Sequence, residues 1–303
     1  MAYWAPPLAS KLGIKSIIYS PVCAAALAYN LQQIRKDRPI AAGPPRGYPS
    51  SAVVLWPHEA RLLHFLSFPV GEGITFHERF TAAMKRCDII SVRTCQEIAV
   101  PFCDYMERQS GKPVLITGPV LPEPSPMELE DRWAQWLGGF KPGSVISCAL
   151  GSQNFPEKDQ FQELLLGFEL TGLSFLAALK PPLGAVTIEE ALPEGFQGRA
   201  GGRGVVQGGW VPQPSILSHW ESLMSDPQIV LVPEHSDQTF RARLLAKELT
   251  VAVVVEREEN GWLSKESLCK AIKSTRWRKE TLMSQGFMSN YIDDFVHQLL
   301  DLK

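Results

Sequence analysis

Several features that mark specialised classes of protein are missing from this sequence. Its 30 basic and 32 acidic side chains nearly cancel to a net charge of −2, so no basic excess draws the chain to nucleic acid or anionic lipid. Its six cysteines are scattered and form no CxxC pair, which argues against a disulfide-stapled secreted domain and favours a reducing compartment. No apolar run approaches the roughly 20 residues that span a bilayer, and the N-terminus has no signal-peptide pattern. These absences predict a cytoplasmic protein with no membrane span and no nucleic-acid partner.

Patterns for metal and dinucleotide sites are missing as well. No spacing of histidine, cysteine or carboxylate matches a zinc site or an EF-hand. The glycine-rich stretch Gly201–Gly204 lacks the Lys-Ser/Thr ending of a P-loop, and no GxGxxG follows a strand, which argues against a dinucleotide-dependent oxidoreductase. We therefore expect no metal and no resident cofactor.

What is present is an alternation of short apolar runs with amphipathic segments. The 303 residues, 45% of them apolar, suffice for one large domain or two of ordinary size. Strands separated by helical patterns are typical of a parallel sheet with crossover helices, so we predict an α/β fold. The expected strands are 17–19, 52–56, 89–92, 113–117, 145–150, 175–179, 204–207, 229–232 and 251–255, and the expected helices are 76–85, 159–170, 239–249 and 264–273.

One break in composition indicates a domain boundary. Residues 119–126 contain four prolines, which can continue neither a helix nor a central strand. We place an interdomain linker at 119–132, between a first domain at 1–118 and a second at 133–277.

The first candidate site is a glycine-serine turn that follows the apolar run 145–150. Gly151 and Ser152 would lie at the carboxyl end of a parallel strand, where open α/β sheets bind ligands. The turn also has a purely structural reading, in which Gly151 supplies unusual dihedral angles and Ser152 bonds its own backbone.

The most specific signal is an ordered set of residues in the second half of the chain. It comprises 209–219, which reads GWVPQPSILSH, then Trp220-Glu221-Ser222, and 232–238, which reads VPEHSDQ. This set resembles the signature box of the plant secondary-product glycosyltransferases, a UDP-sugar-dependent family. The amino-acid sequence of 220–226 is most similar to that of the branch that acts on flavonoid glycosides. The resemblance implies two Rossmann-like domains that face each other across a cleft (GT-B type), here with an incomplete N-terminal domain and a C-terminal helix at 278–303 that packs back on it.

The box offers groups suited to a nucleotide. The Trp210 indole can stack on uracil while the backbone of Val211 meets the edge of the base, and the Glu221 carboxylate can accept both ribose hydroxyls. By resemblance, Gln213 also reaches the ribose. Taken singly, Trp210 could equally be a core aromatic and Glu221 an exposed helix charge.

Further residues of the box are assigned to the sugar and the phosphates. By resemblance, Asp237 and Gln238 bond the hydroxyls of the donor sugar, and Gln238 favours glucose; an acid and an amide offer complementary acceptors and donors to a polyol. Ser152 would contact the phosphates. The structural alternative for Asp237 and Gln238 is an N-cap of a helix that begins near Thr239.

The chain also departs from the family pattern. Only 29 positions run from Trp210 to Gln238, about fifteen fewer than in the family box. His219 aligns either with the histidine that ends the Ile-Leu-x-His run or with the later one that meets the phosphates. The family's catalytic histidine and its orienting aspartate match positions before Met1, so we assign no catalytic residue.

These observations support one main hypothesis and one alternative. The resemblance implies an inverting glycosyltransferase that moves a sugar, with glucose favoured, from its UDP-sugar donor to a hydroxyl of a flavonoid or other plant phenolic glycoside. Both partners are small molecules. The alternative is a shortened, catalytically silent chain that at most binds UDP.

Overall fold

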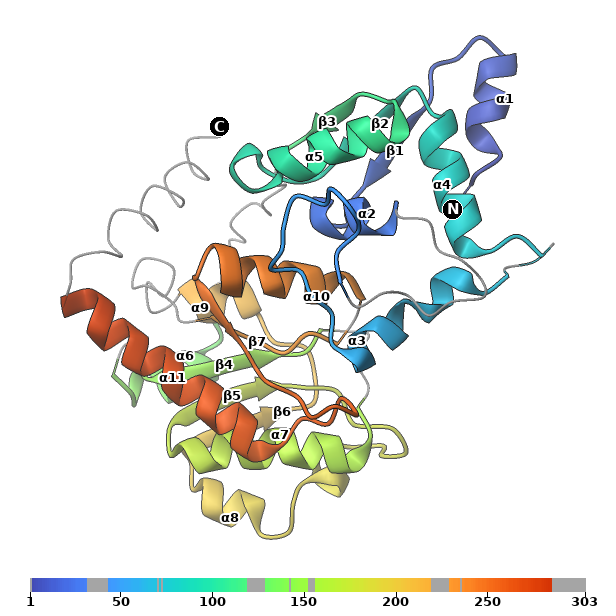
Figure 1. Ribbon diagram of the computed structural model, residues 1–303. Helices are drawn as coiled ribbons and strands as arrows, with labels where there is room; N and C mark the ends of the chain where they lie inside the picture. Colours follow the sequence, from blue (N-terminus) through green and yellow to red (C-terminus); the bar gives the residue numbers. More distant parts are fainter. Residues whose placement is uncertain are drawn as a thin grey trace. The chain divides into compact units, whose positions relative to one another are not determined.

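A computed structural model describes residues 2–31, 43–69, 71, 73–118, 129–141, 143–151, 156–218, 229–234 and 236–284. The chain forms two compact units (Figure 1). Unit 1 consists of Met1–Leu121 and Pro233–Thr250, and unit 2 of Pro122–Val232 and Val251–Lys303.

Unit 1 is built on a parallel three-stranded sheet in the order β1-β2-β3. The strands are β1 (Ile17–Ser20), β2 (Ile89–Val92) and β3 (Val114–Ile116). The connecting helices are α1 (Ala5–Lys11), α2 (Ala24–Asn30), α3 (Pro57–Leu62), η1 (Leu63–Ser67), α4 (Phe76–Arg86) and α5 (Gln96–Ser110). Local signals explain their limits: α4 begins with a capping box in which Thr75 Oγ1 accepts the Glu78 N–H at 3.1 Å. The helix α5 ends at Gly111, whose φ of 68° a side chain would resist.

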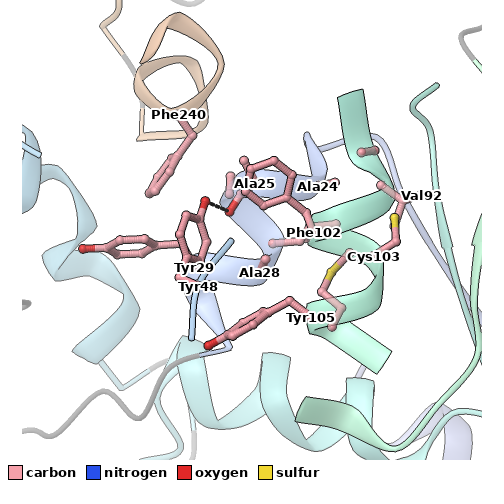
Figure 2. Close-up of a cluster of buried hydrophobic side chains, with 14 of the residues drawn as sticks. Ala24, Ala25, Ala28, Tyr29, Tyr48, Val92, Phe102, Cys103, Tyr105 and Phe240 are labelled. Carbon is pink, nitrogen blue, oxygen red and sulfur yellow. Dashed lines mark hydrogen bonds between the residues drawn. The ribbon is translucent and has the colours of Figure 1, made fainter. Parts of the chain in front are cut away.

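The core of unit 1 includes helices from a late part of the sequence. The helix α10 (Ser236–Arg243) continues into the π-helical turn η3 (Leu244–Glu248). Phe240 of α10 is fully buried, and its ring lies 4.8 Å from that of Tyr29 in α2 (Figure 2). The buried Tyr48 completes the cluster, because its ring packs on Tyr29 and its hydroxyl donates to the Ala25 carbonyl oxygen at 2.9 Å.

Unit 2 has helices on both faces of its larger sheet. The strands β4 (Val145–Ala149), β5 (Ser174–Ala178) and β6 (Gly204–Gln207) form one parallel sheet in that order, and β7 (Ile229–Leu231) and β8 (Ala252–Val254) form a separate parallel pair. The helices are α6 (Asp131–Gly138), α7 (Lys158–Thr171), η2 (Glu189–Ala191), α8 (Phe196–Ala200), α9 (Gln213–Ser218) and α11 (Lys265–Ser284). Because side chains alternate along a strand, Phe175 and Ala177 of β5 pack with α7 and α11, while Leu176 packs with α6 and α9.

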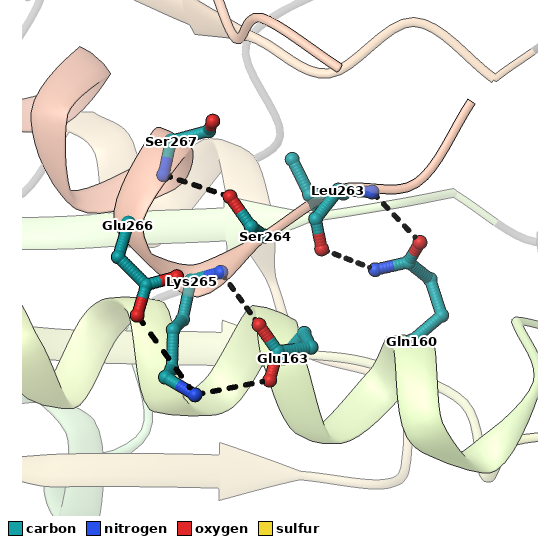
Figure 3. Close-up of polar contacts among 7 residues, drawn as sticks. All are labelled: Gln160, Glu163, Leu263, Ser264, Lys265, Glu266 and Ser267. Carbon is teal, nitrogen blue, oxygen red and sulfur yellow. Dashed lines mark hydrogen bonds and ion pairs between the residues drawn. The ribbon is translucent and has the colours of Figure 1, made fainter. Parts of the chain in front are cut away.

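A set of polar contacts joins α7 to the start of α11 (Figure 3). Glu163 of α7 accepts the Lys265 N–H at 2.8 Å, which satisfies a backbone donor of the first turn of α11. Ser264 Oγ accepts the Ser267 N–H at 3.2 Å and caps the same end. The start of α11 is therefore fixed on α7 by hydrogen bonds as well as by apolar packing.

The α/β class with parallel sheets is confirmed, and one expected strand is wrong. Residues 52–56 form no strand; they run as an extended loop into α3, with Val53 buried and Val54 exposed. Side chains take up the backbone groups of this loop: Ser50 Oγ accepts the Ala52 N–H at 3.1 Å, and Glu59 Oε2 accepts the Trp56 N–H at 2.8 Å. The alternating burial is that of a strand, but these backbone N–H groups donate to side chains and not to a neighbouring strand.

Some expectations on domain limits lie outside the described residues. This holds for 119–128 of the linker and for 285–303 of the C-terminal segment, so the division at 118, 132 and 277 stays a prediction. The structure adds that α6 begins at Asp131 and that 233–250 packs with unit 1. No helix in the described part of the chain is long and apolar enough to cross a membrane.

Candidate functional site

A small cavity opens in unit 2 where the carboxyl end of β4 meets the start of α9. Its volume is about 120 Å³. The lining residues come from β4, β5 and the segment that enters α9: Ser147, Cys148, Ala149, Leu176, Ala178, Val211, Gln213 and Ile216. The carboxyl end of a parallel strand is the expected ligand position in an open α/β sheet, so this cavity is a candidate binding site.

The segment that follows β6 brings two of the predicted nucleotide-binding residues, Val211 and Gln213, to this cavity. Val211 is 4% exposed and packs with Ile216, and its carbonyl oxygen accepts the Gln213 N–H at 2.8 Å. Gln213 opens α9 and is exposed. Trp210 directly precedes Val211 and is 67% exposed, so its indole is not a core aromatic. An exposed indole is suited to stacking on a planar base.

The size and the polarity of the cavity limit what it can hold. A volume of about 120 Å³ is well below the roughly 300–1,000 Å³ of pockets that enclose a whole ligand, so only one ring-sized part of a ligand fits. Burial raises the pKa of the Cys148 thiol to about 12, so this group is neutral at physiological pH. The cavity therefore contains no anionic thiolate that would repel a nucleotide.

The two residues assigned to the donor sugar lie at the start of α10, in unit 1. The helix begins at Ser236, before the expected start near Thr239, so Asp237 lies in its first turn and does not precede the helix as an N-cap. The Asp237 carboxylate faces Arg241, with Nη2 4.0 Å from Oδ2. Gln238 Oε1 accepts the Glu234 N–H at 2.9 Å, so this side chain bonds the backbone ahead of the helix from within its first turn.

Contacts from α2 fix the backbone at this end of α10. The Cys23 thiol donates to the Asp237 carbonyl oxygen at 3.8 Å. Burial raises the pKa of the Cys23 thiol, which keeps the sulfur protonated and able to donate. The position of Asp237 is thus determined by packing within unit 1.

The remaining assigned residues cannot be placed. Ser152, His219 and Glu221 lie outside the described residues. The structure brings Val211 and Gln213 together at one cavity, with Trp210 adjacent in the chain, and it places Asp237 and Gln238 together at the start of one helix.

The part of the cavity that the sheet contributes was not predicted from the sequence. Cys148 and Ala178 are near the carboxyl ends of β4 and β5, and the parallel pairing aligns Cys148 with Ala177 and Ala149 with Ala178. The signal available in the sequence was the position of these residues at the ends of two predicted parallel strands. Among the described residues, no group of three or more histidine, cysteine or carboxylate side chains is placed to hold a metal ion.

Comparison with known sequences gives close relatives of one kind. No protein-family model matches the chain. The chain is 48% identical over 330 aligned positions to UDP-glycosyltransferase 79B6 of Arabidopsis thaliana, covering 98% of the chain and 72% of that protein. It is 45% identical to the anthocyanidin 3-O-glucoside 2'''-O-xylosyltransferase of the same plant, covering 99% of the chain and 73% of that protein. Since the first alignment is longer than the chain's 303 residues, the relative has internal residues that this chain lacks.

Comparison with solved structures gives the same fold at lower identity. A UDP-glucosyltransferase from Polygonum tinctorium matches with a TM-score of 0.72 at 20% identity, over 100% of this chain and 75% of that one. A transferase from Siraitia grosvenorii, solved in complex with UDP, matches with a TM-score of 0.70 at 23% identity, over 98% of this chain and 76% of that one. The two-unit α/β architecture is therefore that of solved nucleotide-sugar transferases.

Proposed function

Because the chain belongs to the plant UDP-glycosyltransferases, we propose that it transfers a sugar from a UDP-sugar donor to a hydroxyl group of a flavonoid or other plant phenolic glycoside. The predicted family and the GT-B fold are confirmed by the relatives and by the solved structures. The donor sugar, the acceptor and the residues that bind them form the proposal.

The observation that carries the proposal is the cavity at the carboxyl end of β4, which Val211 and Gln213 line, with the exposed Trp210 directly before Val211 in the chain. In our proposal the indole stacks on the uracil ring, and the cavity residues Val211 and Gln213 meet the base edge and the ribose. A base inserted there is removed from water between an indole and an apolar wall, which favours binding through stacking and burial. Glu221 completes the nucleotide contacts by accepting the ribose hydroxyls, and Ser152 and His219 contact the phosphates.

For the sugar half of the donor we propose Asp237 and Gln238. Both lie in the first turn of α10, and their carboxylate and amide can pair with the hydroxyls of a hexose. We propose glucose as the donor sugar. A xylosyl donor is the competing choice, since a relative at 45% identity is named for xylosyl transfer to an anthocyanidin glucoside.

The proposed reaction is a displacement at the anomeric carbon. The acceptor oxygen forms the new bond while the bond to the β-phosphate oxygen of UDP breaks, and UDP leaves with the electron pair. A general base takes the proton of the acceptor hydroxyl. The residues named above bind the donor, and none of them is assigned the role of that base.

We propose that the reaction needs no metal. We also propose a cytoplasmic location, which the six free thiols support.

The test is a calorimetric titration of the purified chain with UDP, combined with a transfer assay. The assay offers UDP-glucose and UDP-xylose separately, each with a flavonoid glucoside and with its aglycone. Binding together with transfer to the glucoside supports the proposal and identifies the donor. Binding without transfer supports the silent alternative, and a chain that binds no UDP contradicts the proposed site.

A further inference from the structure

The helix α10 is held in unit 1 by a buried ion pair at its last residue. Arg243 Nη2 donates to both carboxylate oxygens of Glu59 in α3, at 2.8 Å each. The two side chains are only 6% and 4% exposed. The residues are 184 positions apart in the sequence, so this contact connects the late helix to the first part of the chain.

Further contacts leave the Arg243 guanidinium little freedom. Its central carbon lies 4.6 Å from the centre of the Trp56 ring, a cation–π distance, and Nε donates to the Val54 carbonyl oxygen at 3.3 Å. Glu59 is fixed from its other side, because its Oε2 also accepts the Trp56 N–H at the start of α3. These contacts hold the planar guanidinium in one orientation. The ammonium group of a lysine lacks the planar fork and would not be oriented in this way.

A buried ion pair of this kind is a poor device for stability alone. The cost of desolvating two charges offsets much of their attraction, and well-packed apolar residues often stabilise a protein equally well. What a directional pair supplies is a defined geometry. At the other end of α10, the Cys23 thiol contacts the Asp237 carbonyl oxygen, and between the two ends Phe240 packs on Tyr29.

These contacts fix both the rotation and the axial position of α10. Asp237 precedes Arg243 by six residues, about 9 Å along the axis at 1.5 Å per residue. A helix of this length moves as a rigid rod, so any rotation at Arg243 is transmitted to the side chains of Asp237 and Gln238. The ion pair therefore contributes to the orientation of the part of α10 that carries Asp237 and Gln238.

We propose that Arg243 and Glu59 are positioning residues for the donor sugar: their ion pair holds α10 so that Asp237 and Gln238 meet the sugar hydroxyls. This inference rests on the proposed function, because it takes Asp237 and Gln238 as the sugar contacts. It adds a pair of residues that touch neither donor nor acceptor and yet determine how strongly the sugar half of the donor is bound.

The test compares the affinities for UDP and for UDP-glucose by calorimetry in the full chain. Arg243→Met removes the charge and keeps the length of the side chain. Glu59→Gln removes the partner charge and keeps an oxygen that can accept the Trp56 N–H. Since UDP lacks the sugar, we expect its affinity to stay within about twofold of the parent, and UDP-glucose affinity to fall on the order of tenfold. Arg243→Lys should give an intermediate loss, because a lysine keeps the charge without the planar fork.

A second ion pair provides a control for the loss of a charge pair as such. Arg199→Met breaks the ion pair of Arg199 with Glu169 in unit 2, where Nε lies 2.6 Å from Oε1. Because Arg199 is 47% exposed, this variant is expected to lower the melting temperature only slightly and to leave the ratio of the two affinities unchanged. If Arg243→Met does not fold, Glu59→Gln and Arg243→Lys decide the question with the same ratio.

The outcomes distinguish a failure of this inference from a failure of the proposed function. An unchanged ratio in the folded Glu59 and Arg243 variants, with a reduced ratio in Gln238→Ala, overturns this inference and leaves the proposed function intact. An unchanged ratio in Gln238→Ala as well overturns the assignment of the sugar contacts and this inference with it. A parent chain that binds neither UDP nor UDP-glucose overturns both.

Discussion

Gln160 and Leu263 exchange two hydrogen bonds across the contact between α7 and α11. The Leu263 N–H donates to Gln160 Oε1 at 3.0 Å, and Gln160 Nε2 donates to the Leu263 carbonyl oxygen at 2.8 Å (Figure 3). Leu263 is only 2% exposed, so this one side chain satisfies both backbone groups of a buried residue. The pair fixes the chain just before α11 and thereby holds the edge of the core of unit 2.

Replacing this side chain should destabilise unit 2. We expect Gln160→Ala to lower the free energy of unfolding by about 2 kcal/mol, because a buried N–H and a buried carbonyl oxygen lose their partner. Gln160→Glu retains the acceptor for the Leu263 N–H and should cost less. Urea unfolding followed by circular dichroism measures both changes. A change below about 0.5 kcal/mol in Gln160→Ala would show that water replaces the amide at no cost.

Gly204 permits the close approach of β6 to the Phe175 ring. A Cβ atom at Gly204 would lie 2.1 Å from Phe175 Cζ, a distance that no packed side chain tolerates. We expect Gly204→Ala to destabilise the protein by about 1–3 kcal/mol, since the buried ring must leave its place in the core. The control is Gly198→Ala in α8, where a Cβ atom would have no heavy atom within 4 Å. There we expect a slight gain of about 0.5 kcal/mol, because alanine favours a helix more than glycine does. Equal melting temperatures for the two variants would contradict this account.

Trp210 should carry a large share of the affinity for UDP. Trp210→Ala removes the stacking surface, and we expect it to weaken UDP binding by about 1–3 kcal/mol without lowering the melting temperature, since the side chain is 67% exposed. Trp4→Ala is a suitable control. Trp4 is similarly exposed, at 59%, but it is the N-cap residue of α1 in unit 1, whereas Trp210 belongs to unit 2. Calorimetric titration with UDP measures both variants. The proposed stacking role is wrong if Trp4→Ala and Trp210→Ala bind UDP equally well.

Stability should decrease at alkaline pH because the folded state raises the pKa of two thiols. Burial raises the pKa of the Cys148 thiol from 9.0 to about 12. Above pH 9 the unfolded chain loses this proton while the folded chain keeps it, so the folded state binds more protons and its stability falls as the pH rises towards 12. Below pH 9 the contribution is fully present. We expect the melting temperature to fall between pH 8 and pH 11 more steeply in the parent than in Cys148→Ala.

Cys103 provides a comparison for the same measurement. Burial raises the pKa of its thiol to about 11, so Cys103→Ala should also flatten the pH dependence, over a narrower range that ends near pH 11. Parallel curves for the parent and both variants would mean that other groups control the alkaline transition.

The sequence determined the class of the fold and supplied the candidate residues of the site. Alternating apolar runs and amphipathic segments predicted β4, β5 and β6 and the helix α7 because these elements depend on side-chain periodicity, a local property. The contiguous run from Trp210 to Gln213 could be proposed because its residues are neighbours in the chain and together resemble the family box.

The tertiary structure decided which distant groups meet. The burial pattern of residues 52–56 is that of a strand, yet their hydrogen bonds go to the Ser50 and Glu59 side chains, a choice that no local pattern encodes. Cys148 and Ala178 became cavity residues only through the register of β4 and β5. Likewise, a separation of 184 residues gives no periodic signal that Arg243 would pair with Glu59 and fix α10 in unit 1. Local propensity depends on neighbouring residues. A long-range contact depends on how distant segments of the chain pack together, which only the folded structure shows.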